Sequence, residues 1–152
     1  MIRKIISGGQ TGVDRAALDV ACELGIPRGG WCPKGRLAED GPLHLNYPLK
    51  ETRSCDYKQR TEWNVRDSDG TLVIHDGIIS DGTHLTIVFT SNYKKPCLQV
   101  DLNNAFSKRD FRLWIKEHRV YVLNVAGPRE AEKLKIFDRA AGFLRTILDA
   151  CV

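Results

Sequence analysis

The sequence predicts an α/β fold in which mainly parallel strands alternate with helices. Short apolar runs of strand length recur along the 152 residues, and most are followed by a segment with apolar residues at helical spacing. Glycine-rich turns join several of these strand–helix pairs. The length, with 42% hydrophobic and 28% charged residues, fits one compact domain, so we expect residues 1–152 to form a single domain.

The first strand–helix unit occupies the N-terminal 25 residues. Residues 2–6 predict a strand, and the turn 7–12 connects it to a helix that Gly25 is expected to end. The helix has one apolar stripe, formed by Val13, Ala17, Val20, Ala21 and Leu24. Residues 28–32 predict a short second strand.

The middle of the chain is less regular. Residues 33–56 contain three prolines and several charges without a clear period, and predict a long loop of the kind that is often functional or mobile. A polar helix is predicted at 57–67 and a strand at 71–75.

The C-terminal half again predicts strands that alternate with helices. The turn 76–82 leads into a helix with Leu85, Val88 and Phe89, for which Asp81 and Thr83 are candidate caps. A strand at 97–102, a helix around Phe111, Trp114 and Ile115, and a strand at 120–125 follow. We expect Gly127-Pro128 to open the last helix, because proline is tolerated at the first helical position. The expected buried stripe of that helix consists of Leu134, Phe137, Ala141, Leu144, Leu148 and Cys151.

Three of the predicted strand-to-helix turns contain glycine: 7–14, 76–83 and 124–129. The carboxyl ends of parallel strands meet at one edge of a sheet, where glycine amides and helix N-termini favour an anion. The turns therefore predict a site for a phosphate-bearing ligand. Each turn taken alone is equally well explained as a tight connection with a capped helix. Neither common nucleotide fingerprint, GxxxxGK[ST] or GxGxxG, is present.

Composition and spacing exclude several other classes. The net charge of +4 is spread along the chain, which suits an anionic small molecule at least as well as a nucleic acid, and we expect no nucleic-acid partner. No apolar run could span a membrane, and the segment 1–6 is too short for a signal-peptide core, so we expect a cytoplasmic protein. The four histidines and five cysteines have no metal-ligand spacing, so we expect no protein-ligated metal.

Other polar residues are candidates for the walls of such a site. Arg60, Asn64 and Asp67 would share one face of the polar helix, which is either solvated or lines a pocket. Lys34, Arg36, Arg15 and Arg129 could supply positive potential around an anion, although each alone is more often a surface charge.

Several blocks of the sequence, in order and over nearly its whole length, resemble the molybdenum carrier family. The blocks are Ser7-Gly8-Gly9-Gln10-Thr11-Gly12-Val13-Asp14-Arg15, Gly30-Trp31-Cys32-Pro33-Lys34-Gly35-Arg36, Ala38-Glu39-Asp40-Gly41, residues 60–69 and Asn124-Val125-Ala126-Gly127-Pro128-Arg129-Glu130. The resemblance implies a Rossmann-like three-layer α/β/α fold, related to lysine-decarboxylase-like domains. It also implies binding of molybdenum cofactor (molybdopterin), whose pterin carries a phosphate, in a homo-oligomer that could serve molybdoenzymes as recipients.

Matching positions assign candidate ligand-binding residues. The resemblance suggests a first anion-binding loop consisting of Gly8, Gly9, Gln10, Thr11, Gly12, Asp14 and Arg15. It suggests a second consisting of Gly82 and Thr83. Further candidates are Lys34, Arg36, Arg60, Asn64, Gly127 and Arg129.

Related phosphoribohydrolases carry a PGGxGTxxE pattern whose glutamate supports cleavage of an N-glycosidic bond. The segment after Gly82-Thr83 lacks that glutamate, so Asp14 or Glu62 would have to replace it. We therefore expect a carrier without catalytic residues. The alternatives are a nucleotide phosphoribohydrolase and a sensor of a nucleotide derivative.

Overall fold

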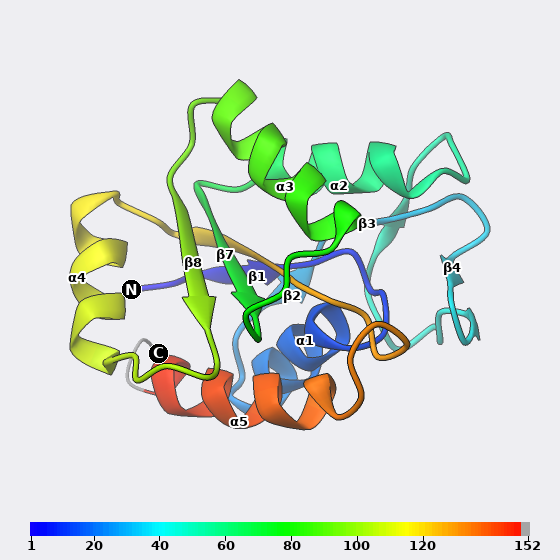
Figure 1. The fold of residues 1–152 in the computed structure, drawn as a ribbon. Helices are drawn as coiled ribbons and strands as arrows, with labels where there is room; N and C mark the ends of the chain where they lie inside the picture. Colours follow the sequence, from blue (N-terminus) through cyan, green and yellow to red (C-terminus); the bar gives the residue numbers. More distant parts are fainter. Residues whose placement is uncertain (150–152) are drawn as a thin grey trace.

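Five parallel strands form the central sheet of the computed structural model, which describes residues 1–149 (Figure 1). All four pairings in this sheet are parallel, as predicted. In spatial order the strands are β2 (Arg28–Gly29), β1 (Lys4–Ile6), β9 (Val122–Ala126), β7 (Gly70–His75) and β8 (Cys97–Asp101).

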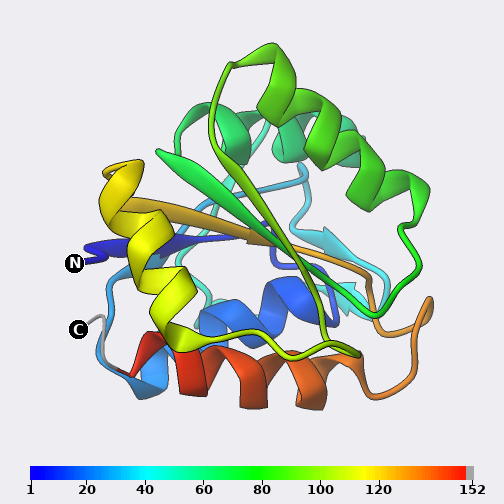
Figure 2. The same cartoon turned by 60° about the vertical axis from the view of Figure 1, so that its left-hand side comes forward.

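Helices cover both faces of the sheet and complete the expected three-layer α/β/α arrangement. They are α1 (Val13–Glu23), α2 (Tyr57–Arg66), α3 (Asp81–Asn92), α4 (Lys108–Glu117) and α5 (Ile136–Leu148). Connections that run along the sheet towards β8 pass through α2 and α3, and those that run towards β2 pass through α1 and α4. Because such crossovers are right-handed, opposite directions place helices on opposite faces. Figures 1 and 2 show α2 and α3 together on one face and α1 with α5 on the other.

The strand order is regular when it is counted from β7 rather than from β1. From that start, β8-β7-β9-β1-β2 becomes 2-1-3-4-5, a common order of doubly wound sheets. The helix after β7 lies on one face and the helix after β9 on the other, so the switch point lies between these two strands. Ligands of doubly wound proteins bind at that point, outside the carboxyl ends of the strands.

The two faces of the sheet differ in polarity. Ile5, Leu72, Ile74, Leu123 and Val125 join a continuous hydrophobic core with α1, α4 and α5. Alternation along the strands turns their neighbours towards α2 and α3, and these include the polar Thr71 and Asn124. The buried residues of α3 are correspondingly three threonines and one phenylalanine. The layer under α2 and α3 is therefore partly polar.

The segment predicted as a long loop is ordered by short strands and by one arginine. The predicted strand at 28–32 is interrupted at Gly30, whose φ is 125°. Its second part, β3 (Trp31–Cys32), pairs with β6 (Lys50–Glu51), and β4 (Leu37–Ala38) forms a hairpin with β5 (Gly41–Pro42). Arg36 donates hydrogen bonds to the carbonyls of Leu43, His44, Tyr47 and Leu49.

One predicted helix start and the candidate caps of another helix are wrong. The last helix begins at Ile136, not at Gly127-Pro128, so residues 127–135 form a loop in which Leu134 is 83% exposed. Ala141, Leu144 and Leu148 are buried and Phe137 is partly buried, as expected, whereas Cys151 lies outside the described residues. The cap of α3 is Ser80 rather than Asp81 or Thr83. Of the helices within residues 1–149, none combines the length and apolar character needed to cross a membrane.

Candidate ligand-binding site

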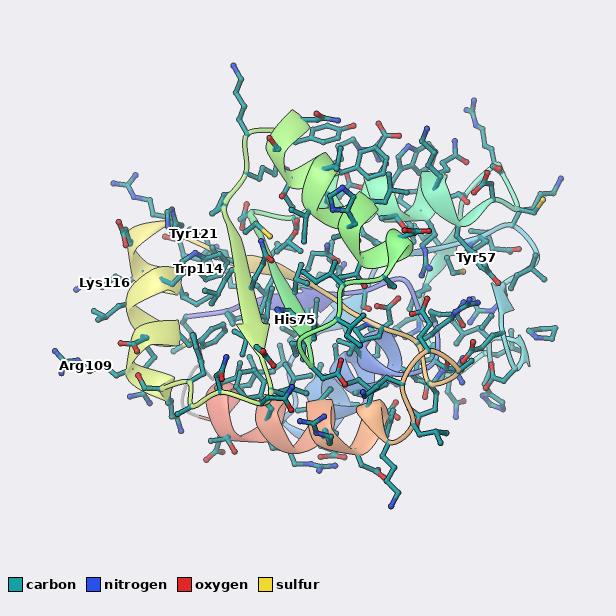
Figure 3. All side chains as sticks on the ribbon, viewed as in Figure 1. Tyr57, His75, Arg109, Trp114, Lys116 and Tyr121 are labelled. Atoms are coloured by element: carbon teal, nitrogen blue, oxygen red, sulfur yellow. The ribbon has the colours of Figure 1, made fainter. Side chains whose placement is uncertain are left out.

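A cavity of ≈ 620 Å³ lies at the switch point of the sheet. Its walls come from the turn after β1, the first two turns of α2, the start of α3, and the end of β9 with the loop that follows. The volume is in the range of sites for small molecules and cofactors. Figure 3 shows Tyr57, which lines the cavity at the start of α2, far from the group of labelled side chains on and beside α4.

The cavity brings together part of the predicted site. The predicted residues that line it are Gly8, Gln10, Asp14, Arg60, Asn64, Gly82, Thr83, Gly127 and Arg129. The predicted residues that do not line it are Gly9, Thr11, Gly12, Arg15, Lys34 and Arg36. Asp67 also lies outside, where it accepts a hydrogen bond from the indole of Trp31 at 2.7 Å.

An ion pair crosses one wall of the cavity. The Arg60 guanidinium lies 3.0 Å from the Asp14 carboxylate, and their side chains are only 11% and 10% exposed. Burial raises the pKa of Asp14 above its ordinary value, although Arg60 acts in the opposite direction. Gly8 makes room for this arrangement, because a Cβ there would lie 1.9 Å from a terminal nitrogen of Arg60.

The N-terminus of α3 forms a second wall. The Ser80 side chain caps the helix at the amide of Thr83, and the Ser80 hydroxyl lies 3.2 Å from the Thr83 hydroxyl. Nothing lies within 4 Å of the position that a Cβ on Gly82 would occupy, so its backbone is open to a ligand. Helix N-termini with accessible amides favour anions.

Charges of both signs surround the cavity. The cations in its lining are Lys58, Arg60 and Arg129, and the carboxylates are Asp14, Asp56, Asp81 and Glu132. Arg129 lies 3.6 Å from Glu39 and 3.4 Å from Glu132. Lys58 is exposed and makes no ion pair with any residue in 1–149. Lys58 is thus the lining cation that is most available to a ligand.

The predicted residues outside the cavity mostly hold the β4–β5 hairpin. Arg15 contacts both carboxylate oxygens of Asp40, at 2.5 and 3.1 Å. The Thr11 hydroxyl donates to the Glu39 carboxylate, which also accepts from the amide of Ala131. The first glycine-rich loop therefore faces the cavity on one side and the hairpin on the other.

Gly12 and Lys34 complete this group. A Cβ on Gly12 would lie 2.4 Å from the carbonyl oxygen of Pro128, so glycine lets the first loop pack against the loop after β9. Lys34 is an exposed residue away from the cavity.

Sequence reasoning missed several lining residues. Outside the three predicted turns they are Asp56, Tyr57, Lys58, Thr61, Leu85, Thr86 and Glu132. The predicted turns 76–83 and 124–129 contain five more lining residues that were not named individually as site residues: Ser80, Asp81, Asn124, Val125 and Ala126. Asn124 had a signal in the sequence, because an amide in the middle of the apolar run 122–126 is unusual for a buried strand. Lys58 and Thr86 had none, because only the packing of α2 and α3 brings them together.

The side chains near the cavity do not form a metal centre. Within residues 1–149 no group of three or more histidine, cysteine, aspartate or glutamate side chains is arranged to hold a metal ion. The lining itself contains neither cysteine nor histidine.

Comparison with known proteins agrees with this architecture. Residues 5–148 match the model of the circularly permutated YpsA SLOG family, cpYpsA. The chain is also similar to a solved structure named putative molybdenum carrier protein, from Syntrophus aciditrophicus SB. The two share 49% sequence identity with a TM-score of 0.92, over 97% of this chain and 95% of the other. No protein of curated function gives a match.

The resemblance to molybdenum carriers is confirmed by that structural relative. A permuted family also accounts for a strand order that becomes regular only when it is counted from β7. The match over nearly the whole chain shows that the protein belongs to the circularly permutated YpsA SLOG family.

Proposed function

We propose that the protein is a cytoplasmic carrier that binds molybdenum cofactor through the phosphate of its pterin, without catalysing a reaction. The observation that carries this proposal is the open N-terminus of α3 in a cavity of cofactor size. The name of the structural relative supports the choice of a molybdenum-related ligand.

The residues of the cavity fit a phosphate monoester. The Gly82 amide and the Thr83 hydroxyl would hold the phosphate, with Lys58 supplying a positive charge. Polar neutral side chains, among them Thr86 and Asn124, would surround the remainder of the ligand. The lining contains neither cysteine nor histidine. The protein would therefore bind the pterin and the phosphate, and the metal would keep the ligands that the cofactor itself supplies.

One observation favours a second candidate, a nucleotide phosphoribohydrolase. Asp14 is a buried carboxyl group in the cavity, burial raises its pKa, and an arginine lies beside it. Perturbed carboxyl groups of this kind can serve as general acids. The other candidate, Glu62, is outside the cavity and accepts a hydrogen bond from Tyr93 at 3.0 Å. Asp14 is thus the group on which a hydrolase would depend.

Anaerobic calorimetry tests the two candidates together. The purified protein is titrated with molybdenum cofactor, with molybdate alone and with nucleoside monophosphates, and each mixture is analysed for free base. We expect tight binding of the cofactor, no binding of molybdate and no base release. Release of base that stops in Asp14→Asn would instead establish the hydrolase.

Matched variants locate the phosphate. Thr83→Val should weaken cofactor binding about tenfold or more, because it removes a hydroxyl from the proposed phosphate site. Thr90→Val is the control, since Thr90 is buried on the same side of α3 but does not line the cavity. Equal affinities in the two variants would contradict the placement.

Assembly and delivery are further parts of the proposal. We expect a homo-oligomer, which light scattering coupled to gel filtration will detect. We also expect the loaded protein to activate a molybdoenzyme that lacks its cofactor. A strictly monomeric protein would contradict the expected assembly, and failure to activate such an enzyme would contradict a role in delivery.

A further inference from the structure

Asn124 is a buried amide whose hydrogen-bonding capacity is only partly used. It lies in the middle of β9, is 2% exposed and lines the cavity. Among the described residues its side chain makes one hydrogen bond, from Nδ2 to the Thr71 hydroxyl at 3.2 Å. An asparagine side chain has two donor and two acceptor positions, so the oxygen and one N–H have no protein partner.

The free end of this amide faces the cavity. A polar side-chain atom that is both fully buried and without a partner occurs once in residues 1–149, and it is Nε of Arg15. The Asn124 oxygen also has no partner, so it must be accessible, and the open space beside it is the cavity. Because a hydroxyl can donate or accept, turning the amide over would still leave one end unbonded. Asn124 therefore presents hydrogen-bonding groups to whatever enters the cavity.

Asn64 shows the opposite situation in the same cavity. It is 3% exposed, and both ends of its amide are bound to the backbone of Trp31, at 2.8 and 3.0 Å. Its role is to fasten α2 to β3. Two buried asparagines line one site, and of the two only Asn124 has an amide end with no partner among the described residues.

The surroundings of Asn124 are polar where a core would be expected. Thr83 and Thr86 of α3 are buried and line the cavity together with Asn124. The Thr83 and Thr86 hydroxyls have protein partners in Ser80 and the Gly82 carbonyl, so an apolar ligand would leave chiefly the open end of the Asn124 amide without a partner.

We propose that Asn124 is a specificity-determining residue, which pairs with a neutral donor–acceptor group of a phosphate ester inserted between α3 and the sheet. This inference rests on the proposed phosphate site at α3 and adds the chemistry of the other half of the ligand. The ligand class is a nucleotide-sized phosphate ester whose ring amide or sugar hydroxyls reach Asn124. Inorganic phosphate and alkyl phosphates lack that group.

Calorimetry with four probes tests this inference: inorganic phosphate, ribose 5-phosphate, AMP and GMP. In Asn124→Leu, the affinity for the esters that reach Asn124 should fall roughly 5- to 100-fold, because a buried hydrogen bond is lost. The affinity for inorganic phosphate should stay within about twofold of the wild type. Thr83→Val should instead weaken all four probes. If Asn124→Leu loses affinity for ribose 5-phosphate as well as for the nucleotides, Asn124 binds the sugar. If it loses affinity for AMP or GMP alone, Asn124 binds the base.

If the leucine variant does not fold, Asn124→Asp is used instead, because it keeps the shape of the side chain and a bond with Thr71. This variant should change the ratio of AMP to GMP affinity. Equal weakening of all probes, or unchanged ester binding in both variants, would overturn the role of Asn124. Wild-type affinity for inorganic phosphate equal to that for the esters would also overturn it, while leaving the phosphate site intact. Binding of neither these probes nor molybdenum cofactor would overturn the proposed function itself.

Discussion

The Asp14 carboxylate and the Arg60 guanidinium, 46 positions apart in the sequence, form an ion pair at 3.0 Å that joins the two helical layers. Asp14 lies in the first turn of α1 and Arg60 in α2, on opposite faces of the sheet. Their side chains are almost enclosed by protein, so each charge depends on the other for compensation. The pair therefore couples the shape of the cavity to the packing of both layers.

Gly8→Ala is expected to break this pair. A Cβ at position 8 would lie 1.9 Å from an Arg60 terminal nitrogen and 2.8 Å from Cζ, so the guanidinium must move away. The Asp14 carboxylate would then lose its partner, and the free energy of unfolding should fall by about 1–3 kcal/mol. Urea denaturation measures the loss. Arg66→Gln is the control, because Arg66 pairs with the exposed Asp67 that follows it at the end of α2, and its loss should change stability little.

Gly82→Ala should separate ligand binding from stability. The added methyl group meets nothing within 4 Å, and alanine is favoured over glycine in a helix by up to about 1 kcal/mol. Thermal unfolding should therefore show an unchanged or more stable protein, whereas cofactor affinity should fall because the methyl group blocks approach to the amide. Gly142→Ala, in α5 and equally unobstructed, should stabilise the protein without changing affinity. Undiminished affinity in Gly82→Ala would place the phosphate elsewhere.

Asp76→Asn should loosen the loop 127–135, which forms part of the cavity wall. Burial alone would raise the pKa of Asp76, but Lys133 at 2.8 Å and Arg139 at 3.9 Å hold it below its ordinary value. The stabilisation from this carboxylate is therefore present above pH 3.8 and is lost as the pH falls through the lowered pKa. Hydrogen exchange at neutral pH should be faster in residues 129–135 of the variant. Exchange as slow as in Asp138→Asn, an exposed site on α5, would show that Asp76 does not anchor the loop.

Local sequence patterns predicted most of the fold, because strands appear as short apolar runs and helices as apolar residues at helical spacing. The start of α5 was wrong because Pro128 is a good first helical residue by local criteria, whereas ion pairs such as Asp76–Lys133 hold 127–135 as a loop. The strand order could not be predicted either, since the insertion of β9 between β1 and β7 depends on contacts distant in sequence. Local signals define elements, and tertiary pairing decides their ends and neighbours.

The candidate site was predicted to the extent that glycines and helix starts mark it. Gly8, Gly82 and Thr83 line the cavity, as their turns suggested. Arg15 and Arg36 do not line it, because Arg15 binds Asp40 and Arg36 binds loop carbonyls. The sequence could not show this, since it does not distinguish an arginine that binds a ligand from one that binds the protein. The partners of a charge are set by the three-dimensional fold.

Tyr47 should give the loop 33–56 a measurable dependence on alkaline pH. Burial, together with the hydrogen bond from its hydroxyl to Asp19 at 2.7 Å, raises the pKa of Tyr47 from 10.0 to about 12. Between these values the native state keeps a proton that the unfolded chain has lost, so the stabilisation is complete below pH 10 and disappears as the pH rises towards 12. Burial and Glu62 also raise the pKa of Tyr93, so the step to follow in an ultraviolet titration is the one near pH 12; Tyr47→Phe should remove that step and flatten the stability profile over this range. Tyr121→Phe, at an exposed tyrosine, should leave the late step in place. If the late step survived in Tyr47→Phe, the hydrogen bond to Asp19 would not be what keeps Tyr47 protonated.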